Sequence, residues 1–436
     1  MFGLKPKDYV LGVQHLFAMF GATVLVPLLT GLNPAVALLT AGCGTLIFHL
    51  LTKFKVPVFV GSSFAFIPAV AAITLQNGVV NPEKVPFAQG GIIVAGLLYS
   101  VFALIAFLVG VDRIKKLFPP VVTGPVIVVI GIGLAGTAIG DATNYADLSQ
   151  GVTKEALICI LIALFTLAIV VIANVFAKGF FKLVPILLGI AGGYILCLIL
   201  NACGVFQMSF EAIAASDWIN IPFVSKDANG VAFMSLPKFD WGAILSIAPI
   251  AIVTFMEHLG DITTNGAVVG KDFFKDPGLH RTLLGDGIAT AFAGLFGGPA
   301  NTTYSENTGV LATTKNYNPA ILRVAAVFAI ILALFGKFGA ILQTIPNPVK
   351  GGVEIVLFGM IAAIGIRTLA ESKLDFTHSR NLLIVALILV LGLGIGSLGG
   401  IPIIVGDVTL NISGLFVAVL FGVIANLILP EAPDAE

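Results

Sequence analysis

Two acidic side chains in one apolar segment are the first residues whose spacing suggests chemistry. Glu257 and Asp261 lie four residues apart in Ile252-Val-Thr-Phe-Met-Glu-His-Leu-Gly-Asp261, so a helix places them on one face, one turn apart. Neighbouring carboxylates removed from water repel each other unless one holds a proton. The pair therefore suits a proton-binding site. The alternative is a structural Asp261 that caps the helix end or faces Lys271.

A polar stretch, Asn301-Thr-Thr-Tyr-Ser-Glu-Asn-Thr-Gly309, interrupts the apolar sequence further along. Its polar groups need partners, so the stretch must be buried in protein or line a polar cavity. If the helix is broken there, free backbone N–H groups can donate to a carbonyl, and Glu306 can accept from an N–H. We interpret the stretch as half of a solute-binding site. The alternative is that Glu306 is a structural polar residue.

A second weakly apolar stretch, Gly61-Ser-Ser-Phe-Ala-Phe66, lies near the N-terminus. Phe64 can stack on a planar ring and present its own unpaired backbone. Together with Tyr304 and Ser305 it predicts a pocket for a flat, polar, neutral heterocycle. Because the chain has 33 phenylalanines, ordinary packing is the alternative for Phe64.

Two histidines are candidates for supporting roles. A lone histidine in an apolar segment is more often a structural partner than a ligand, and for His258 a direct role in proton coupling is the second interpretation. His15 is expected to hold the first apolar segment against the one that contains Glu306. Five further residues lie near segment ends; the histidines are expected to be solvated and the acids are not assigned to the site: His49, His280, His378, Asp286 and Glu354.

The composition describes a membrane protein. The 436 residues are 58% hydrophobic and 11% charged, whereas soluble proteins carry about 25% charged residues. Many apolar runs reach the ~20 residues that span a bilayer as a helix. The formal net charge is zero, so the chain lacks the excess of basic residues that nucleic-acid binding requires. The start, Met1 to Asp8, shows no removable signal peptide.

Motifs for other chemistry are missing from the sequence. It contains no P-loop, HExxH or GxSxG pattern, which argues against an ATP-driven pump or a membrane hydrolase. The four cysteines have no metal-ligand spacing. We therefore expect no catalytic residues, no metal and no cofactor.

Fourteen apolar segments are predicted, of which the third and tenth are short and poorly apolar at their centres. With the N-terminus in the cytoplasm, 17 of the 23 Lys and Arg residues fall on the cytoplasmic side and 6 on the other, as the positive-inside rule favours. Both termini are therefore predicted to be cytoplasmic, with residues 204–240 as an extracytoplasmic loop. The segments are 10–30, 34–52, 56–75, 89–111, 117–139, 156–177, 182–203, 241–262, 280–298, 301–314, 318–336, 348–366, 381–397 and 409–429.

The two halves of the chain contain similar motifs in the same order. Gln14-His15-Leu16 resembles Glu257-His258-Leu259, and Pro120-Val-Val-Thr-Gly124 resembles Pro348-Val-Lys-Gly-Gly352, in the same order. The matches divide the chain into repeats 10–203 and 241–429 of seven segments each. Because seven is odd, the second repeat enters the membrane from the opposite side. Such inverted repeats are typical of secondary transporters, in which interrupted spans mark the binding site.

The site residues resemble a known family. Glu306-Asn-Thr-Gly309-Val-Leu-Ala-Thr-Thr314-Lys315 fits the signature of the nucleobase–ascorbate transporters, the second family of nucleobase–cation symporters. Gln14 to Pro27, Gly61 to Phe66 and Asp276 to Arg281 match the bacterial uracil permease branch. The resemblance covers essentially the whole chain.

The resemblance implies an all-α polytopic membrane protein with 14 spans in a 7+7 inverted repeat. Spans 3 and 10 would be broken and carry short extended segments that pair near mid-membrane. Residues 1–111 and 241–336 would form a core domain of spans 1–4 and 8–11. Residues 112–203 and 345–430 would form a gate domain of spans 5–7 and 12–14, through which a homodimer is expected.

The resemblance also assigns roles to individual residues. Glu257 and Glu306 would bind the pyrimidine edge, and His15 would brace span ten. At the position of Asp261 a uracil permease of this family has a histidine linked to proton coupling, whereas purine-transporting members can carry Asp. The coupled proton is thus assigned to Glu257, Asp261 or His258. The pocket lining and the supporting residues would be Phe64, Tyr304, Ser305, Ala22, Gln14 and Asn307.

We therefore expect a multi-pass uracil:proton symporter of the cytoplasmic membrane, with a nucleobase and protons as partners and no enzymatic activity. A xanthine or uric acid symporter of the same family is the first alternative. An anion transporter with the same inverted repeat is the second, and it would not be expected to place two acidic residues at its solute.

Overall fold

The computed structural model describes residues 4–76, 79–110, 113, 116–147, 149, 151–372, 374–405 and 408–430. Within these residues, nine helices are long and apolar enough to cross a membrane. The prediction of a helical integral membrane protein is therefore confirmed. The nine are α1 (Pro6–Thr30), α2 (Pro34–Leu51), α4 (Val85–Val109), α6 with α7 (Pro120–Gly133 and Ala135–Ala142), α8 (Lys154–Phe176), α9 (Pro185–Ala202), α11 with α12 (Trp241–Ile247 and Ile250–Val269), α17 (Asn347–Glu371) and α18 (Ser379–Ser397).

Shorter elements complete the bundle. The helices are η1 (Phe64–Phe66), α3 (Ile67–Thr74), η3 (Gly179–Leu183), α10 (Glu211–Ala215), the π turn η4 (Phe274–Gly278), α13 (Leu279–Phe296), α14 (Ser305–Thr314), α15 (Pro319–Ala333), α16 (Gly336–Gln343) and α19 (Gly414–Ile428). The strands form three antiparallel pairs: β1 (Val60–Ser62) with β4 (Asn301–Thr303), β2 (Leu75–Gln76) with β3 (Val79–Val80), and β5 (Ile401–Val405) with β6 (Val408–Ile412).

Local sequence explains where many helices begin. A polar side chain before the helix accepts a hydrogen bond from a backbone N–H of its first turn, which otherwise has no partner. Proline then often occupies the first turn, where its missing N–H costs nothing, as in α2 and α15. The capping side chains are Asn33, Thr153, Asp240, Asn318 and Ser413.

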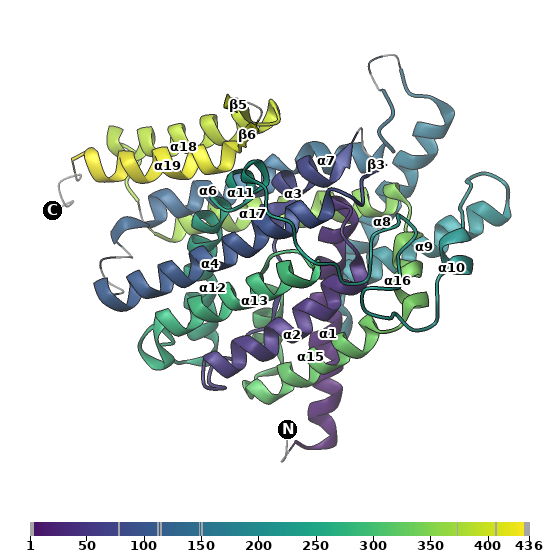
Figure 1. Ribbon diagram of the computed structural model, residues 1–436, viewed down its shortest axis with the longest axis horizontal. Coiled ribbons are helices and arrows are strands. Elements are labelled where there is room, and N and C mark those ends of the chain that lie inside the picture. The colour runs from purple at the N-terminus through teal and green to yellow at the C-terminus, as the bar shows by residue number, and fades with distance from the viewer. Residues whose placement is uncertain are drawn as a thin grey trace.

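The long helices lie side by side in two packed groups (Figure 1). In the first, α4 packs against α13, and α2 packs against α13 and α15. In the second, α6 packs against α17 and α18, with α8, α9 and α19 beside them. Small residues allow close approach in the first group, since a Cβ at Gly96 would lie 2.6 Å from the carbonyl oxygen of Gly287.

Residues 204–240 form an irregular segment, the cap segment, at one end of the bundle. Its backbone bonds to the helices beneath it, from the N–H of Asn220 to the carbonyl of Leu334 and from the N–H of Lys238 to that of Pro86. In Figure 1 its helix α10 lies at the right, whereas the chain ends lie at the lower and left edges.

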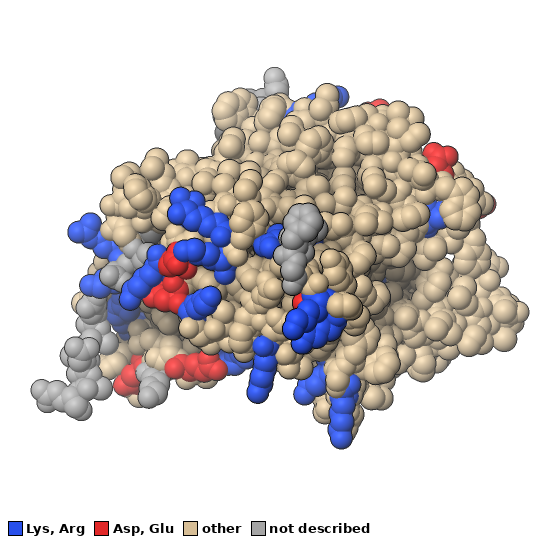
Figure 2. All heavy atoms as spheres, turned by 90° about the horizontal axis from the view of Figure 1, so that it is seen from below, with Lys and Arg blue, Asp and Glu red and all other residues tan. Residues whose placement is uncertain are grey.

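The surface shows where lipid contact is expected. Figure 2, which views the molecule from below, shows Lys and Arg gathered at its left and lower parts, while much of the remaining face carries few charges. Large apolar side chains on α4 and α8 are exposed, including Phe107 and Phe176 at 65% and 72%. Such a surface suits a bilayer better than water.

The end of the eighth apolar segment differs from its prediction. The sequence predicts that the eighth apolar segment ends near residue 262, but helix α12 continues to Val269. Its polar residues remain helical because Thr263 and Thr264 donate to the carbonyls of Leu259 and Gly260, one turn back. Glu257 consequently lies near the middle of α12 and not near its end.

Candidate functional site

The site is built on two short strands from distant parts of the chain. Strand β1 pairs with β4 in antiparallel register, with Gly61 opposite Thr302. Two further backbone bonds extend the ladder, from Ser63 to Ala300 and from Tyr304 to Phe59. The helical turn η1 follows β1, and α14 follows β4. The N-terminal N–H groups of both helical segments therefore flank the strand pair, and such groups lack partners within the helix.

Close packing holds this crossing in place. A Cβ at Gly61 would lie 2.6 Å from the ring of Tyr304, so only glycine fits. The Tyr304 hydroxyl donates to the carbonyl of Ser62 at 2.8 Å. The Ser62 hydroxyl in turn donates to the carbonyl of Thr23 on α1 at 2.9 Å. These bonds tie β1, β4 and α1 into one unit.

The three predicted acidic residues come together beside the strands. Glu257, Asp261 and Glu306 are all partly buried. Glu257 lies near enough to Glu306 for their charges to interact, and Asp261 near enough to Glu257. Thr303 of β4 donates from its hydroxyl to Asp261 Oδ2 at 3.0 Å. Glu306 lies in the first turn of α14, where the helix dipole favours a negative charge.

His258 points away from this cluster and into the protein. It is fully buried, with Nδ1 2.8 Å from Asp286 Oδ2 and Nε2 2.9 Å from the Thr282 hydroxyl, both on α13. Asp286 Oδ2 also accepts from the backbone N–H of Thr303 at 3.3 Å. Thr303 thus connects the buried His258–Asp286 pair to Asp261.

Asp286 and Thr303 contact the predicted residues, although neither is among them. The expectation that Asp286 lies near a segment end is wrong, because it lies within α13 with its carboxyl fully buried between α12 and β4. A signal was available, since an ionisable residue within a membrane segment is by default a functional candidate. Thr303 carried no such signal, since its role depends on the strand pairing.

Another expectation also fails, for His49. It was expected to be solvated, but it is fully buried. Its Nε2 lies 2.8 Å from the carbonyl oxygen of Val58, because the chain that leads into β1 folds back over α2. The acid Glu354 is likewise fully buried.

The predicted supporting residues of α1 lie against α14. Asn307 Nδ2 donates to the carbonyl oxygen of His15 at 3.0 Å and lies 3.1 Å from His15 Nδ1. Gln14 is partly buried beside them, and Ala22 is fully buried two turns further along α1. Helix α1 therefore braces α14 at Asn307, next to Glu306.

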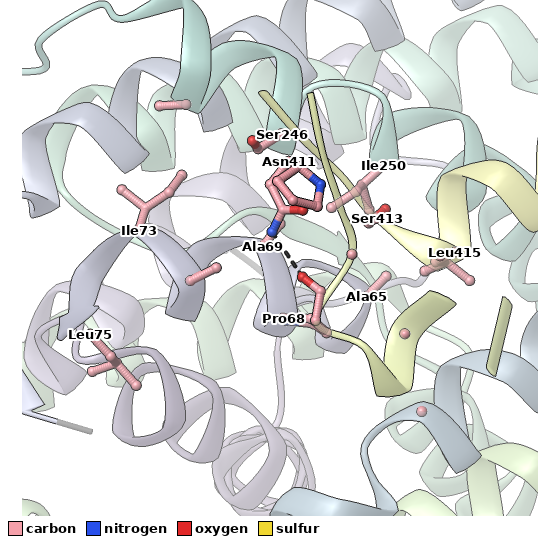
Figure 3. A pocket seen from close by; sticks show the side chains of 18 of the residues that line it. Ala65, Pro68, Ala69, Ile73, Leu75, Ser246, Ile250, Asn411, Ser413 and Leu415 are labelled. Carbon is pink, nitrogen blue, oxygen red and sulfur yellow. Dashed lines mark hydrogen bonds between the residues drawn. The ribbon is translucent and has the colours of Figure 1, made fainter. Parts of the chain in front are cut away.

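Phe64 lines a large cavity. The cavity measures about 820 Å³, and Phe64 and Ala65 are among the residues that line it. Figure 3 shows its wall, formed by Pro68, Ala69 and Ile73 of α3, Ser246 and Ile250 of α11 and α12, and Asn411, Ser413 and Leu415 from β6 to α19. Glu257 and Glu306 do not line it. Gly260 and Thr264, which follow Glu257 on α12, are exposed. Ser305 and Gly309, on either side of Glu306 in α14, are also exposed.

The fold combines long apolar helices with a partly buried polar site at the β1–β4 strand pair, from which η1 and α14 begin. These features define a membrane transport protein. Residues 6–398 match the family described as the Permease family, and the chain belongs to it. This is the nucleobase–ascorbate transporter family that its site residues resemble. The protein is an integral membrane permease and not an enzyme.

The relatives cover the chain almost completely. It is 45% identical to the uracil permease of Bacillus caldolyticus over 98% of this chain and 92% of the relative. It is 43% identical to a probable uracil permease of Haemophilus influenzae over 99% of this chain and 96% of the relative. The transmembrane domain of a cyanobacterial bicarbonate transporter, BicA, has the same fold with a TM-score of 0.61 at 17% identity, covering 97% of each chain.

Proposed function

We propose that the protein imports uracil by proton symport across the cytoplasmic membrane. The observation that carries this proposal is the meeting of Glu257, Asp261 and Glu306 beside the starts of η1 and α14. Relatives that match nearly the whole chain are named uracil permeases, which supports a pyrimidine as the solute.

The site offers both kinds of hydrogen-bonding group that uracil requires. Its ring carbonyls accept from free N–H groups at the helix starts and from the protonated carboxyl of Glu257, and its ring N–H groups donate to the carboxylate of Glu306. Phe64, with Tyr304, Ser305 and Ala22 nearby, lines the pocket. The site should reject solutes that lack such carbonyl and N–H groups, because its carboxyl groups would then be left without hydrogen-bond partners.

A co-transported proton supplies the driving force. Uracil is neutral near pH 7, so the membrane potential acts only on the proton, at about 2.3 kcal/mol per 100 mV. In our proposal Glu257 and Asp261 share this proton. Protonated Glu257 donates to a uracil carbonyl, and its deprotonation weakens binding. His258, whose two ring nitrogens are occupied by Asp286 and Thr282, supports Asp261 through Thr303 and is the second candidate for the proton.

The proposed architecture is 14 spans in a 7+7 inverted repeat. The broken spans 3 and 10 contain β1 and β4, the core comprises residues 1–111 and 241–336, and the gate comprises 112–203 and 345–430. Within these ranges, residues 1–3, 77, 78, 111, 112, 114, 115, 148, 150, 373, 406 and 407 lie outside the described part of the chain. The two packed groups of helices support this division. Both termini lie in the cytoplasm, and a homodimer forms through the gate.

Purine transport is a second candidate, and Asp261 is the residue that favours it. The fold shared with BicA is not evidence for anion transport here, because three partly buried carboxylates at the site would repel an anionic solute.

Proteoliposomes test the proposal directly. An inward proton gradient should drive accumulation of radiolabelled uracil that a protonophore abolishes, and excess xanthine should compete weakly. Glu257→Gln should lose accumulation, whereas Glu371→Gln, which changes an exposed residue of α17, should keep it. Normal accumulation by Glu257→Gln would refute the coupling role, and stronger competition by xanthine than by unlabelled uracil would favour a purine symporter.

A further inference from the structure

A second pair of buried carboxyl groups lies outside the solute site. Asp141 of α7 is 2% exposed and Glu354 of α17 is fully buried. Both carboxyl oxygens of Glu354 and Oδ2 of Asp141 lack a hydrogen-bond donor within the described part of the chain. The two carboxyl groups are, however, within hydrogen-bonding reach of each other. A proton held between these facing oxygens would supply the donor that both carboxyl groups lack.

One cation accompanies the pair. Lys350 lies one turn before Glu354 on α17, and its Nζ is 3.5 Å from Asp141 Oδ2, with the side chain 12% exposed. Two ionised carboxylates and one ammonium would leave a net charge of −1 out of water, which is costly. A single bound proton makes the cluster neutral.

The backbones of α7 and α17 pack closely beside the two carboxyl groups. A side chain at Gly351 would run into the backbone nitrogen of Ala142, so α7 and α17 are in contact beside the pair. Asp141 and Glu354 thus lie beside a tight contact between the two helices. Their repulsion, if both were ionised, would act directly on this helix contact.

Other titratable groups around α17 do not replace the missing donor. The Tyr145 hydroxyl lies within hydrogen-bonding reach of Asp141, but Glu354 keeps two unpartnered oxygens. Helix α8 carries buried Cys159 and, at its exposed start, Lys154 and Glu155; α9 carries Tyr194, which bonds to Thr344, and buried Cys197; α6 carries no ionisable residue.

We propose that Asp141 and Glu354 form a second proton-binding site, in which one proton is held between their facing oxygens and Lys350 supplies the counter-charge. This site is independent of Glu257 and Asp261. Loss of its proton loosens the contact between α7 and α17. The helix pair is thereby sensitive to pH without any solute bound.

Infrared spectroscopy and thermal unfolding of the purified full chain test this site together. The wild type should show a protonated-carboxyl carbonyl band that decreases in Glu354→Gln and in Asp141→Asn. Its melting temperature should fall between about pH 6 and pH 9, whereas Glu354→Gln, which mimics the protonated acid, should lose this fall. Glu371→Gln, at an exposed position on the same helix, should behave as wild type in both measurements.

Two results would overturn the inference. Spectra of Glu354→Gln and Asp141→Asn that retain the full wild-type band would mean that neither acid is protonated. Recovery of alkaline stability by sodium ions, without such a band, would indicate a cation site. Lys350→Met gives a further check, because removing the ammonium should move the pH-dependent fall to higher pH, and a move to lower pH would contradict the proposed charge balance.

Discussion

Phe64 of η1 and Phe358 of α17 pack edge to face, with ring centroids 6.0 Å apart and an interplanar angle of 76°. Phe64 follows β1 almost directly, so this contact joins the strand crossing to a helix of the other packed group. A displacement of α17 would therefore also displace Phe64, which lies beside the proposed solute site.

Replacing the two rings should have different effects. Phe64→Ala removes the proposed ring contact with the solute, so the KM for uracil uptake should rise roughly 2- to 12-fold, the equivalent of about 0.5–1.5 kcal/mol for an aromatic pair. Phe358→Ala should alter the maximal rate more than the KM. Phe292→Ala disrupts another ring pair, with Phe296 on α13, and should leave the KM unchanged. An unaltered KM in Phe64→Ala would remove Phe64 from the pocket.

Gly61 and Tyr304 should be coupled in stability. Gly61→Ala places a methyl group against the Tyr304 ring, and such overpacking costs about 1–3 kcal/mol. Tyr304→Leu alone should also destabilise, because it loses the hydrogen bond to Ser62. The double variant should melt at a higher temperature than the sum of the single effects predicts. Additive shifts would show that the two residues do not constrain each other.

Replacing Asp286 should reduce the stability of the protein more than replacing Thr282, the other partner of the buried His258. Asp286→Asn weakens two bonds to one oxygen, from His258 and from the Thr303 backbone, and should reduce stability by about 1–3 kcal/mol. Thr282→Val removes only the partner of Nε2 and should cost less. Thermal unfolding and the pH profile of uptake would be measured together. Equal losses in both variants, with unchanged pH profiles, would make the network purely structural.

The cap segment should be more stable in acid. Asp227 Oδ1 accepts from the N–H groups of Asn229 and Val231 at 2.9 Å, and Oδ2 accepts from Gln343. Burial raises the pKa of Asp227 from 3.8 to about 6, against these hydrogen bonds, which lower it. The folded segment thus binds the proton more tightly than the unfolded one. Its extra stability is full below pH 3.8 and is lost as the pH rises through about 6.

Hydrogen exchange of residues 221–232, corrected for the intrinsic rate, would measure this effect. Exchange should be slower at about pH 5 than at about pH 8, and Asp227→Asn should remove the difference. Glu211→Gln, at an exposed position on α10, serves as the control. Slower exchange at the higher pH would contradict the assigned sign.

Much of this protein follows from its sequence alone, because burial in lipid demands long apolar helices. The segment predicted at 381–397 is the helix Ser379–Ser397, and that predicted at 156–177 is Lys154–Phe176. The polarity of Asn301 to Gly309 in an apolar chain was enough to indicate Glu306, and spacing on one helical face was enough to pair Glu257 with Asp261.

Only the tertiary structure decided which distant groups meet. Thr303 links Asp261 to the buried His258–Asp286 pair because β4 lies against α12 and α13, and no local pattern encodes that register. Asp141 and Glu354 are separated by more than two hundred residues, and each alone reads as a polar residue near a helix end. Hydropathy and periodicity report the environment of a single segment, whereas hydrogen bonds between segments depend on how the helices pack.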